Sequence, residues 1–198
     1  MKYIFPAAMA FMLLFLQSCK KDPVIEVPED FSSFIRGTTP AFYGKISDST
    51  VSWVFGPQFQ MGHFAGITTV SGIPEKILSF DLVAEYDLNT RIYISIPKYA
   101  VGSEDLFTKV VSPGEKIIGP QYDKYFLRLT VNKKVHTTNG DQTGSTLKVI
   151  QMYKTTDGSG NDIVLVWISL NVKFYDGLGK YAFSVQKGKF LASFRYTL

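Results

Sequence analysis

Hydrophobic side chains at every second position dominate this chain from about residue 33 onward. In residues 78–86 apolar side chains alternate with side chains that are mostly polar. The alternation resumes at 91–96 after a polar turn at 87–90. Successive side chains of a strand point to opposite faces, so this period predicts an antiparallel hairpin with one buried face. The same alternation predicts strands at residues 125–131, 164–174 and 190–198.

Shorter alternating segments predict further strands at residues 40–46, 51–60, 65–71, 106–111, 145–154 and 180–186. Ile163, Leu165 and Trp167 make one strand apolar on both faces, which is typical of a central strand. Two similar segments, 179–183 and 188–192, are predicted to be the arms of a hairpin. No segment of ten or more residues has a helical period, although a one-turn helix around residues 28–35 or 103–108 is compatible with the pattern. We therefore predict an all-β fold, a single antiparallel β-sandwich or lipocalin-like barrel of about ten short strands.

The N-terminus has a different pattern. Residues 3–16 are apolar and follow Lys2, which is typical of a secretory signal peptide, and they are too few for a membrane span of about 20 residues. The next residues, Leu16-Gln17-Ser18-Cys19, contain the only cysteine of the chain. They resemble the lipobox of bacterial lipoproteins, which implies cleavage before Cys19 and attachment of acyl chains to it. More than one acyl chain is what stable membrane anchoring requires.

The segment after Cys19 is polar, with prolines at 23 and 28, as expected of a tether. We predict a signal peptide at 1–18, a lipid anchor and tether at 19–32 and an all-β domain at 33–198. The start of the tether is similar to outer-membrane lipoproteins of glycan-scavenging Gram-negative bacteria, which implies an outer-membrane location on either the cell surface or the periplasmic face. Residues 167–174 and 188–194 resemble small uncharacterised all-β lipoproteins of the same bacteria.

The net charge of +4 does not indicate a nucleic-acid partner. Lys2, Lys20 and Lys21 lie before residue 22, which leaves 18 of the 21 basic residues against 17 acidic ones. The longest basic run in that remainder is Lys133-Lys134. A protein that follows a phosphate backbone needs a clustered basic face, so no nucleic-acid partner is expected.

Histidines are too few to indicate catalysis. His63 and His136 are the only two, neither lies in a motif, and Gly-x-Ser-x-Gly is absent. We expect His63 at a turn or strand end and His136 in solvent. Because the only cysteine is assigned to the lipid anchor, a usual zinc site is not expected either, and the sequence predicts no cofactor.

Carboxylates offer two further alternatives. Asp81 and Glu85 lie on one face of a predicted strand, four residues and roughly 13 Å apart, which is too far for a retaining glycosidase pair. We expect both to face solvent. Asp157-Gly158-Ser159-Gly160-Asn161-Asp162 resembles a calcium loop in composition but lacks the closing glutamate, so a hairpin connection is the favoured interpretation.

Aromatic residues are abundant, with 16 Phe, 11 Tyr and 2 Trp. Trp53, Tyr93 and Trp167 are candidates for a ligand-binding surface, because such rings join a flat apolar face to a polar tip. The segment 53–75, rich in glycine, aromatic and amide residues, is a candidate lining. We expect a non-catalytic binding or accessory module, with a glycan or an outer-membrane protein as partner. The alternatives are a lipocalin-like carrier of an apolar ligand, although the Gly-x-Trp motif of lipocalins is absent, a small β-sandwich hydrolase, or a structural subunit.

Overall fold

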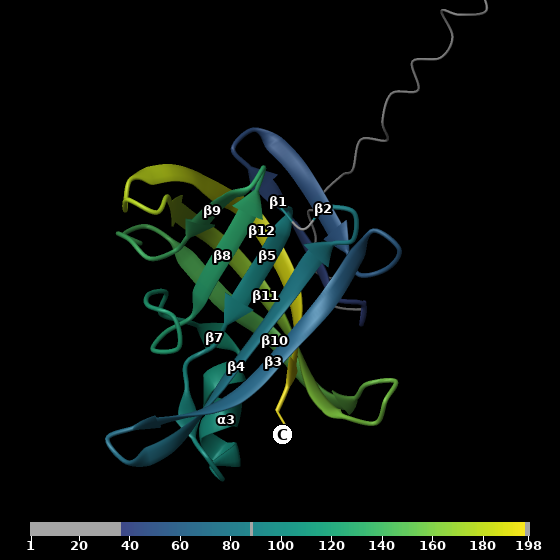
Figure 1. Cartoon of the computed structure of the whole chain (residues 1–198), viewed down its shortest axis with the longest axis vertical. Helices are drawn as coiled ribbons and strands as arrows, with labels where there is room; N and C mark the ends of the chain where they lie inside the picture. Colours follow the sequence, from purple (N-terminus) through teal and green to yellow (C-terminus); the bar gives the residue numbers. More distant parts are fainter. Residues whose placement is uncertain (1–36, 88, 197–198) are drawn as a thin grey trace, which may run out of the picture.

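The computed structural model describes residues 37–87 and 89–196, most of which lie in strands (Figure 1). The prediction of an all-β fold is confirmed, because this part of the chain holds 12 strands and a single short helix. In chain order the elements are β1 (Ala41–Ile46), β2 (Ser49–Val54), β3 (Phe59–Val70), β4 (Ile73–Ala84), β5 (Arg91–Ser95), β6 (Tyr99–Ala100), α3 (Glu104–Val111), β7 (Gly114–Glu115), β8 (Phe126–Val131), β9 (Lys134–Thr137), β10 (Thr146–Thr156), β11 (Asp162–Tyr175) and β12 (Tyr181–Arg195).

All the strands belong to one antiparallel sheet that curls on itself. Its hydrogen-bonded path runs β2-β1-β12-β11-β9-β8-β5-β4-β3, with β10 paired to β11 and β7, and β6 paired to β4. The link between β9 and β11 is a single residue pair, Tyr175 opposite Thr137, and the sheet folds over there. Figure 1 shows the result, with a front layer of β3, β4, β5 and β8 facing a rear layer of β10, β11 and β12.

Aromatic side chains fill the space between the two layers. Phe190 on β12 is fully buried, and its ring centroid lies 5.8 Å from that of Phe42 on β1 and 5.9 Å from that of Phe80 on β4. Phe80 shares its face of β4 with Leu78 and Leu82, both fully buried, which confirms the predicted core face of this strand. Phe190 therefore joins the front layer to the rear layer.

The first half of β11 is buried on both faces. Val164, Val166 and Ile168 of β11 point into the main core, whereas Ile163, Leu165 and Trp167 form a second cluster with Leu191 of β12. This arrangement confirms that β11 is a central strand, hydrogen-bonded to β10 on one side and β12 on the other.

The predicted strand at 106–111 is wrong, because these residues form most of α3. Phe107 and Val111, four residues apart, are the buried residues of the helix. Phe107 packs with Tyr99 at 5.4 Å and Tyr196 at 5.1 Å between ring centroids, so the helix covers one end of the sheet (Figure 1). A short apolar run does not distinguish a buried strand from one helical face, and acidic Glu104 and Asp105 in the first turn favour the helix.

Two other predicted boundaries are wrong. The segment 51–60 is interrupted, because β2 ends at Val54 and β3 begins at Phe59, on either side of a Gly56-Pro57 turn. The segments 179–183 and 188–192 are not hairpin arms, because Tyr181–Arg195 is one long strand with a bulge at Lys187. Lys187 has a φ of 50°, as the extra residue of a bulge often requires.

The predicted signal peptide at 1–18, the lipid anchor at Cys19 and the tether at 19–32 lie outside the described residues. In the part of the chain that is described, no helix has the length and apolar character needed to cross a bilayer.

Candidate binding pocket

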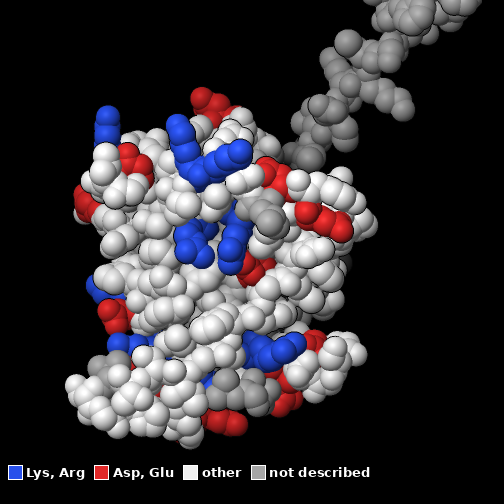
Figure 2. All heavy atoms as spheres, viewed as in Figure 1, with Lys and Arg blue, Asp and Glu red and all other residues white. Residues whose placement is uncertain are grey.

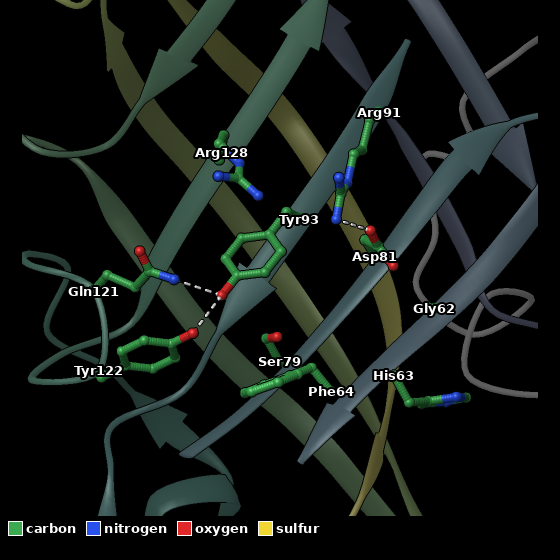
Figure 3. Close-up of a pocket in the computed structure, with 10 residues that line it drawn as sticks. All are labelled: Gly62, His63, Phe64, Ser79, Asp81, Arg91, Tyr93, Gln121, Tyr122 and Arg128. Atoms are coloured by element: carbon green, nitrogen blue, oxygen red, sulfur yellow. Dashed lines mark hydrogen bonds and ion pairs between the residues drawn. The ribbon is translucent and has the colours of Figure 1, made fainter. Parts of the chain in front are cut away.

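An open pocket of about 320 Å³ lies on the outer face of the front layer (Figure 3). Strand register builds most of it, because Gly62 on β3 pairs with Asp81 on β4, Asp81 with Tyr93 on β5, and Tyr93 with Arg128 on β8. These side chains point away from the core, since their strand neighbours such as Phe80 point into it. Four residues from one row of the sheet thus share one surface.

Asp81 is held in this row by an ion pair. Its carboxylate contacts the Arg91 guanidinium, and the residue is only 7% exposed. Gly62 makes room for it, because a Cβ at that position would collide with the Asp81 carboxylate. The expectation that Asp81 faces solvent is therefore wrong. A charge this buried needs a partner, and Arg91 on the next strand supplies it.

The side chains of Tyr93, Gln121 and Tyr122 are linked by hydrogen bonds beside Arg128. The Gln121 amide Nε2 donates to the Tyr93 hydroxyl at 2.6 Å, and the Tyr122 hydroxyl lies 3.3 Å from the same oxygen (Figure 3). Gln121 and Tyr122 come from the loop before β8. Burial, followed by the hydrogen bond with Tyr93, raises the pKa of Tyr122 to about 12. The phenol is therefore neutral at physiological pH and can donate as well as accept a hydrogen bond.

Arg128 and Phe64 also line the pocket. The Arg128 guanidinium carbon lies 4.6 Å from the centroid of the Tyr93 ring, a cation–π contact. Within the described part of the chain, Arg128 has no side-chain hydrogen bond or ion pair. Phe64 is 52% exposed. The pocket thus combines an exposed aromatic ring, neutral hydroxyl and amide groups, and a cation.

The structure separates the three aromatic residues that the sequence singled out. Tyr93 lines the pocket, whereas Trp53 packs in the main core and Trp167 in the second cluster. Trp53 is stacked on Phe59 at 5.7 Å between ring centroids, and Trp167 is 2% exposed. Of the candidate lining at 53–75, residues 62–64 reach the pocket.

His63 borders the pocket, but its ring points away from Tyr93 (Figure 3). It lies in the middle of β3, not at a turn or strand end as expected, and its Nε2 is 3.0 Å from the Ser193 hydroxyl of β12. Burial, and then the Arg195 charge, lower the pKa of His63, so the imidazole is neutral at pH 7.

This histidine–serine pair has the spacing of a base and a nucleophile. Ser193, however, is 1% exposed, and no described carboxylate is hydrogen-bonded to the His63 ring. We interpret the pair as a bridge between β3 and β12, two strands that are not joined by a ladder. His136 is not in solvent as expected, because its half-buried ring packs against Phe183 at 4.9 Å.

The carboxylates do not meet in this pocket. Among the described residues that line it, Asp81 is the only carboxylate, and it is neutralised by Arg91. Glu85 is exposed, as expected, and lies past the end of β4, outside the lining. A glycosidase needs two carboxyl groups facing one bond, so this pocket has no such pair.

Asp157 begins the connection between β10 and β11, as the hairpin interpretation predicted. Its carboxylate accepts hydrogen bonds from the backbone of Ser159 and Asn161, from the Asn161 amide, and from Arg195 at 3.0 Å. These donors occupy the oxygens that a cation would need. Across the described residues, no three His, Cys, Asp or Glu side chains are grouped closely enough to hold a metal ion.

The Asp157 cluster predicts a dependence of stability on acid. Hydrogen bonds, first from Asn161, lower the pKa of Asp157 from its ordinary 3.8 to about 2 in the folded protein. A carboxylate with a depressed pKa stabilises the fold above the unfolded pKa and loses that contribution as pH falls toward the folded pKa. We expect Asp157→Asn to lower the denaturant midpoint at pH 7, and the difference from the wild type to shrink between pH 4 and pH 2. An unchanged difference over that range would contradict the assignment.

Arg128, Gln121 and Tyr122 were missed from the sequence. Arg128 occupies a polar position of a correctly predicted strand, and the signal that would have found it is its register opposite Tyr93. Gln121 and Tyr122 lie in a loop, where no periodicity exists to show which side chains turn toward the sheet.

Comparisons with known proteins identified no relative of this chain. No family model matches the chain, and neither the curated proteins nor the solved structures include a similar one. What the protein binds is therefore inferred from the pocket itself.

Proposed function

We propose that this chain is a non-catalytic binding module that is exported, anchored in the outer membrane through lipid on Cys19, and binds a glycan. The observation that carries the proposal is the composition of one open pocket. An exposed Phe64 ring lies there with the Tyr122 phenol, the Gln121 amide and the Arg128 guanidinium. Sugars present an apolar ring face and many hydroxyls, and they are bound by aromatic rings together with side chains that donate and accept hydrogen bonds.

The packed core between the two layers supports a binding site on the outer face of the sheet. Between the layers lie several large side chains that are at most 1% exposed. They include Phe42, Phe80, Phe174, Phe190 and Phe194. A carrier of an apolar ligand needs space inside the barrel, whereas the pocket described above lies on the outer face. The filled core therefore favours a surface binder over a lipocalin-like carrier.

The absence of a carboxylate pair from the lining supports a binding role over hydrolysis. Asp81 is the one carboxylate among the described lining residues, and it is ion-paired with Arg91. Glycoside hydrolysis requires two carboxyl groups on either side of the scissile bond. The pocket as built can hold a sugar without cleaving it.

A thermal-shift screen tests this proposal. A ligand at 100 times its dissociation constant adds about 2.7 kcal/mol of stability, which raises the melting temperature of a chain this size by about 5–10 °C. We expect such a shift with one class among neutral and acidic plant, algal and host oligosaccharides.

The matched variants are Phe64→Ala in the pocket and Tyr153→Ala on β10. Their parent side chains are similarly exposed, at 52% and 55%. Loss of the shift in Phe64→Ala but not in Tyr153→Ala supports the pocket. No shift with any oligosaccharide would overturn the glycan assignment, and a shift that survives in Phe64→Ala would overturn this site.

A further inference from the structure

The charges of the pocket do not cancel. Arg91 and Asp81 neutralise each other in their ion pair, and the lowered pKa of His63 leaves that ring uncharged. Arg128 is then the remaining charge among the described lining residues. Lys133 lies in the turn that follows β8 and Lys134 at the start of β9, and both are exposed. Figure 2 shows basic side chains gathered over β5 and β8 on this face. The pocket therefore has a net positive charge.

Arg128 differs from the other described arginines. Arg91 is paired with Asp81, and Arg195 with Asp157 at 3.0 Å. Arg128 contacts the face of Tyr93 but, among the described residues, has neither a carboxylate partner nor a hydrogen-bond acceptor. A guanidinium has five N–H donors in a planar fork, and stacking on an aromatic ring leaves the edges of that fork available.

We infer that the ligand is an acidic sugar, a glycan unit with a carboxylate that binds Arg128. This inference rests on the proposed glycan-binding function and names the class of glycan. A planar carboxylate can accept two parallel hydrogen bonds from a guanidinium, which gives both direction and strength. The Gln121 and Tyr122 side chains lie beside Arg128 around the Tyr93 hydroxyl, where they can bind the ring hydroxyls of the same sugar (Figure 3).

Arg128 is also held in place before a ligand arrives. The Tyr93 ring beneath it is 6% exposed, and its hydroxyl is fixed by Gln121. Tyr93 packs in turn on Phe126, with 6.3 Å between ring centroids. A cation positioned by a rigid ring loses little side-chain freedom when it binds, which favours affinity.

The test is isothermal titration of the purified full chain with uronic-acid oligosaccharides. The probes are trisaccharides of galacturonate, glucuronate and mannuronate, each compared with its own methyl ester, which keeps the sugar skeleton and removes the charge. A hydrogen-bonded charge pair contributes enough that we expect the ester to bind about 10- to 100-fold more weakly than the acid.

Three variants locate the effect. Arg128→Gln removes the charge and is expected to weaken acid binding by a similar factor, so that the acid and its ester bind this variant with similar affinities. Arg128→Lys keeps the charge but not the fork, and is expected to recover only part of the affinity. Lys148→Gln removes one positive charge from an exposed position on β10, outside the pocket, and is expected to bind as the wild type does.

Each outcome decides the inference. Equal binding of acid and ester, or equal loss for both in Arg128→Gln, overturns the acidic-sugar assignment but leaves a glycan-binding module. Failure of every acidic and neutral oligosaccharide to bind overturns the proposed function as well. If Arg128→Gln does not fold, Arg128→Lys and the comparison of acid with ester still distinguish these results.

Discussion

Replacing Phe190 by alanine is expected to lower the free energy of unfolding by about 3–5 kcal/mol, as for other fully buried phenylalanines. The side chain has no exposed area and touches Phe42 on β1 and Phe80 on β4, so its loss opens a cavity between the two layers. This is a large fraction of the roughly 5–15 kcal/mol that stabilises a typical domain. Denaturant unfolding followed by tryptophan fluorescence measures the change.

The matched control is Leu178→Ala, in the turn between β11 and β12. Leu178 is 94% exposed, so its replacement is expected to alter the free energy of unfolding by less than about 0.5 kcal/mol. A Phe190→Ala variant as stable as Leu178→Ala would mean that the two layers do not share the core described here.

Replacing Cys19 by alanine is expected to move the protein from the membrane fraction to the soluble fraction. The resemblance to a lipobox implies that this thiol is the site of acylation, and each buried CH₂ of an acyl chain contributes about 0.8 kcal/mol to membrane attachment. Fractionation of cells that express the two forms measures the shift, and mass spectrometry of the N-terminal peptide detects the acyl chains.

Lys21→Ala serves as the control, because it changes the tether and leaves the lipobox intact. It is expected to stay in the membrane fraction. Continued membrane association of Cys19→Ala, or an unmodified Cys19 in the wild type, would contradict the anchor.

Alternation predicted the strands well where one face is buried. Leu78, Phe80 and Leu82 point into the core as the period requires, and the doubly apolar start of β11 marked a central strand. It failed at α3, because Phe107 and Val111 lie in a short apolar segment that fits either a strand or a helical face. It also missed that β12 continues past Lys187, since a bulge shifts the phase of the alternation without ending the strand.

The pocket was only partly predictable, because it depends on neighbours from different strands. Tyr93 was found from its position opposite the buried face, but Trp53 occupies a core position and Trp167 a second covered face. Asp81 was correctly placed opposite the core. The sequence could not show that Arg91 pairs with it or that Gly62 leaves space for its carboxylate, because both facts depend on strand register.

NMR can locate ligand binding on the outer face of β3, β4, β5 and β8 residue by residue. Amide shifts of the ¹⁵N-labelled protein would be followed during titration with the oligosaccharide that gives the largest thermal shift. We expect the changes to be concentrated at Gly62, Asp81, Tyr93, Gln121 and Arg128, which line the pocket. Changes centred instead on the rear layer around Trp167, or spread evenly over the chain, would contradict binding at the pocket.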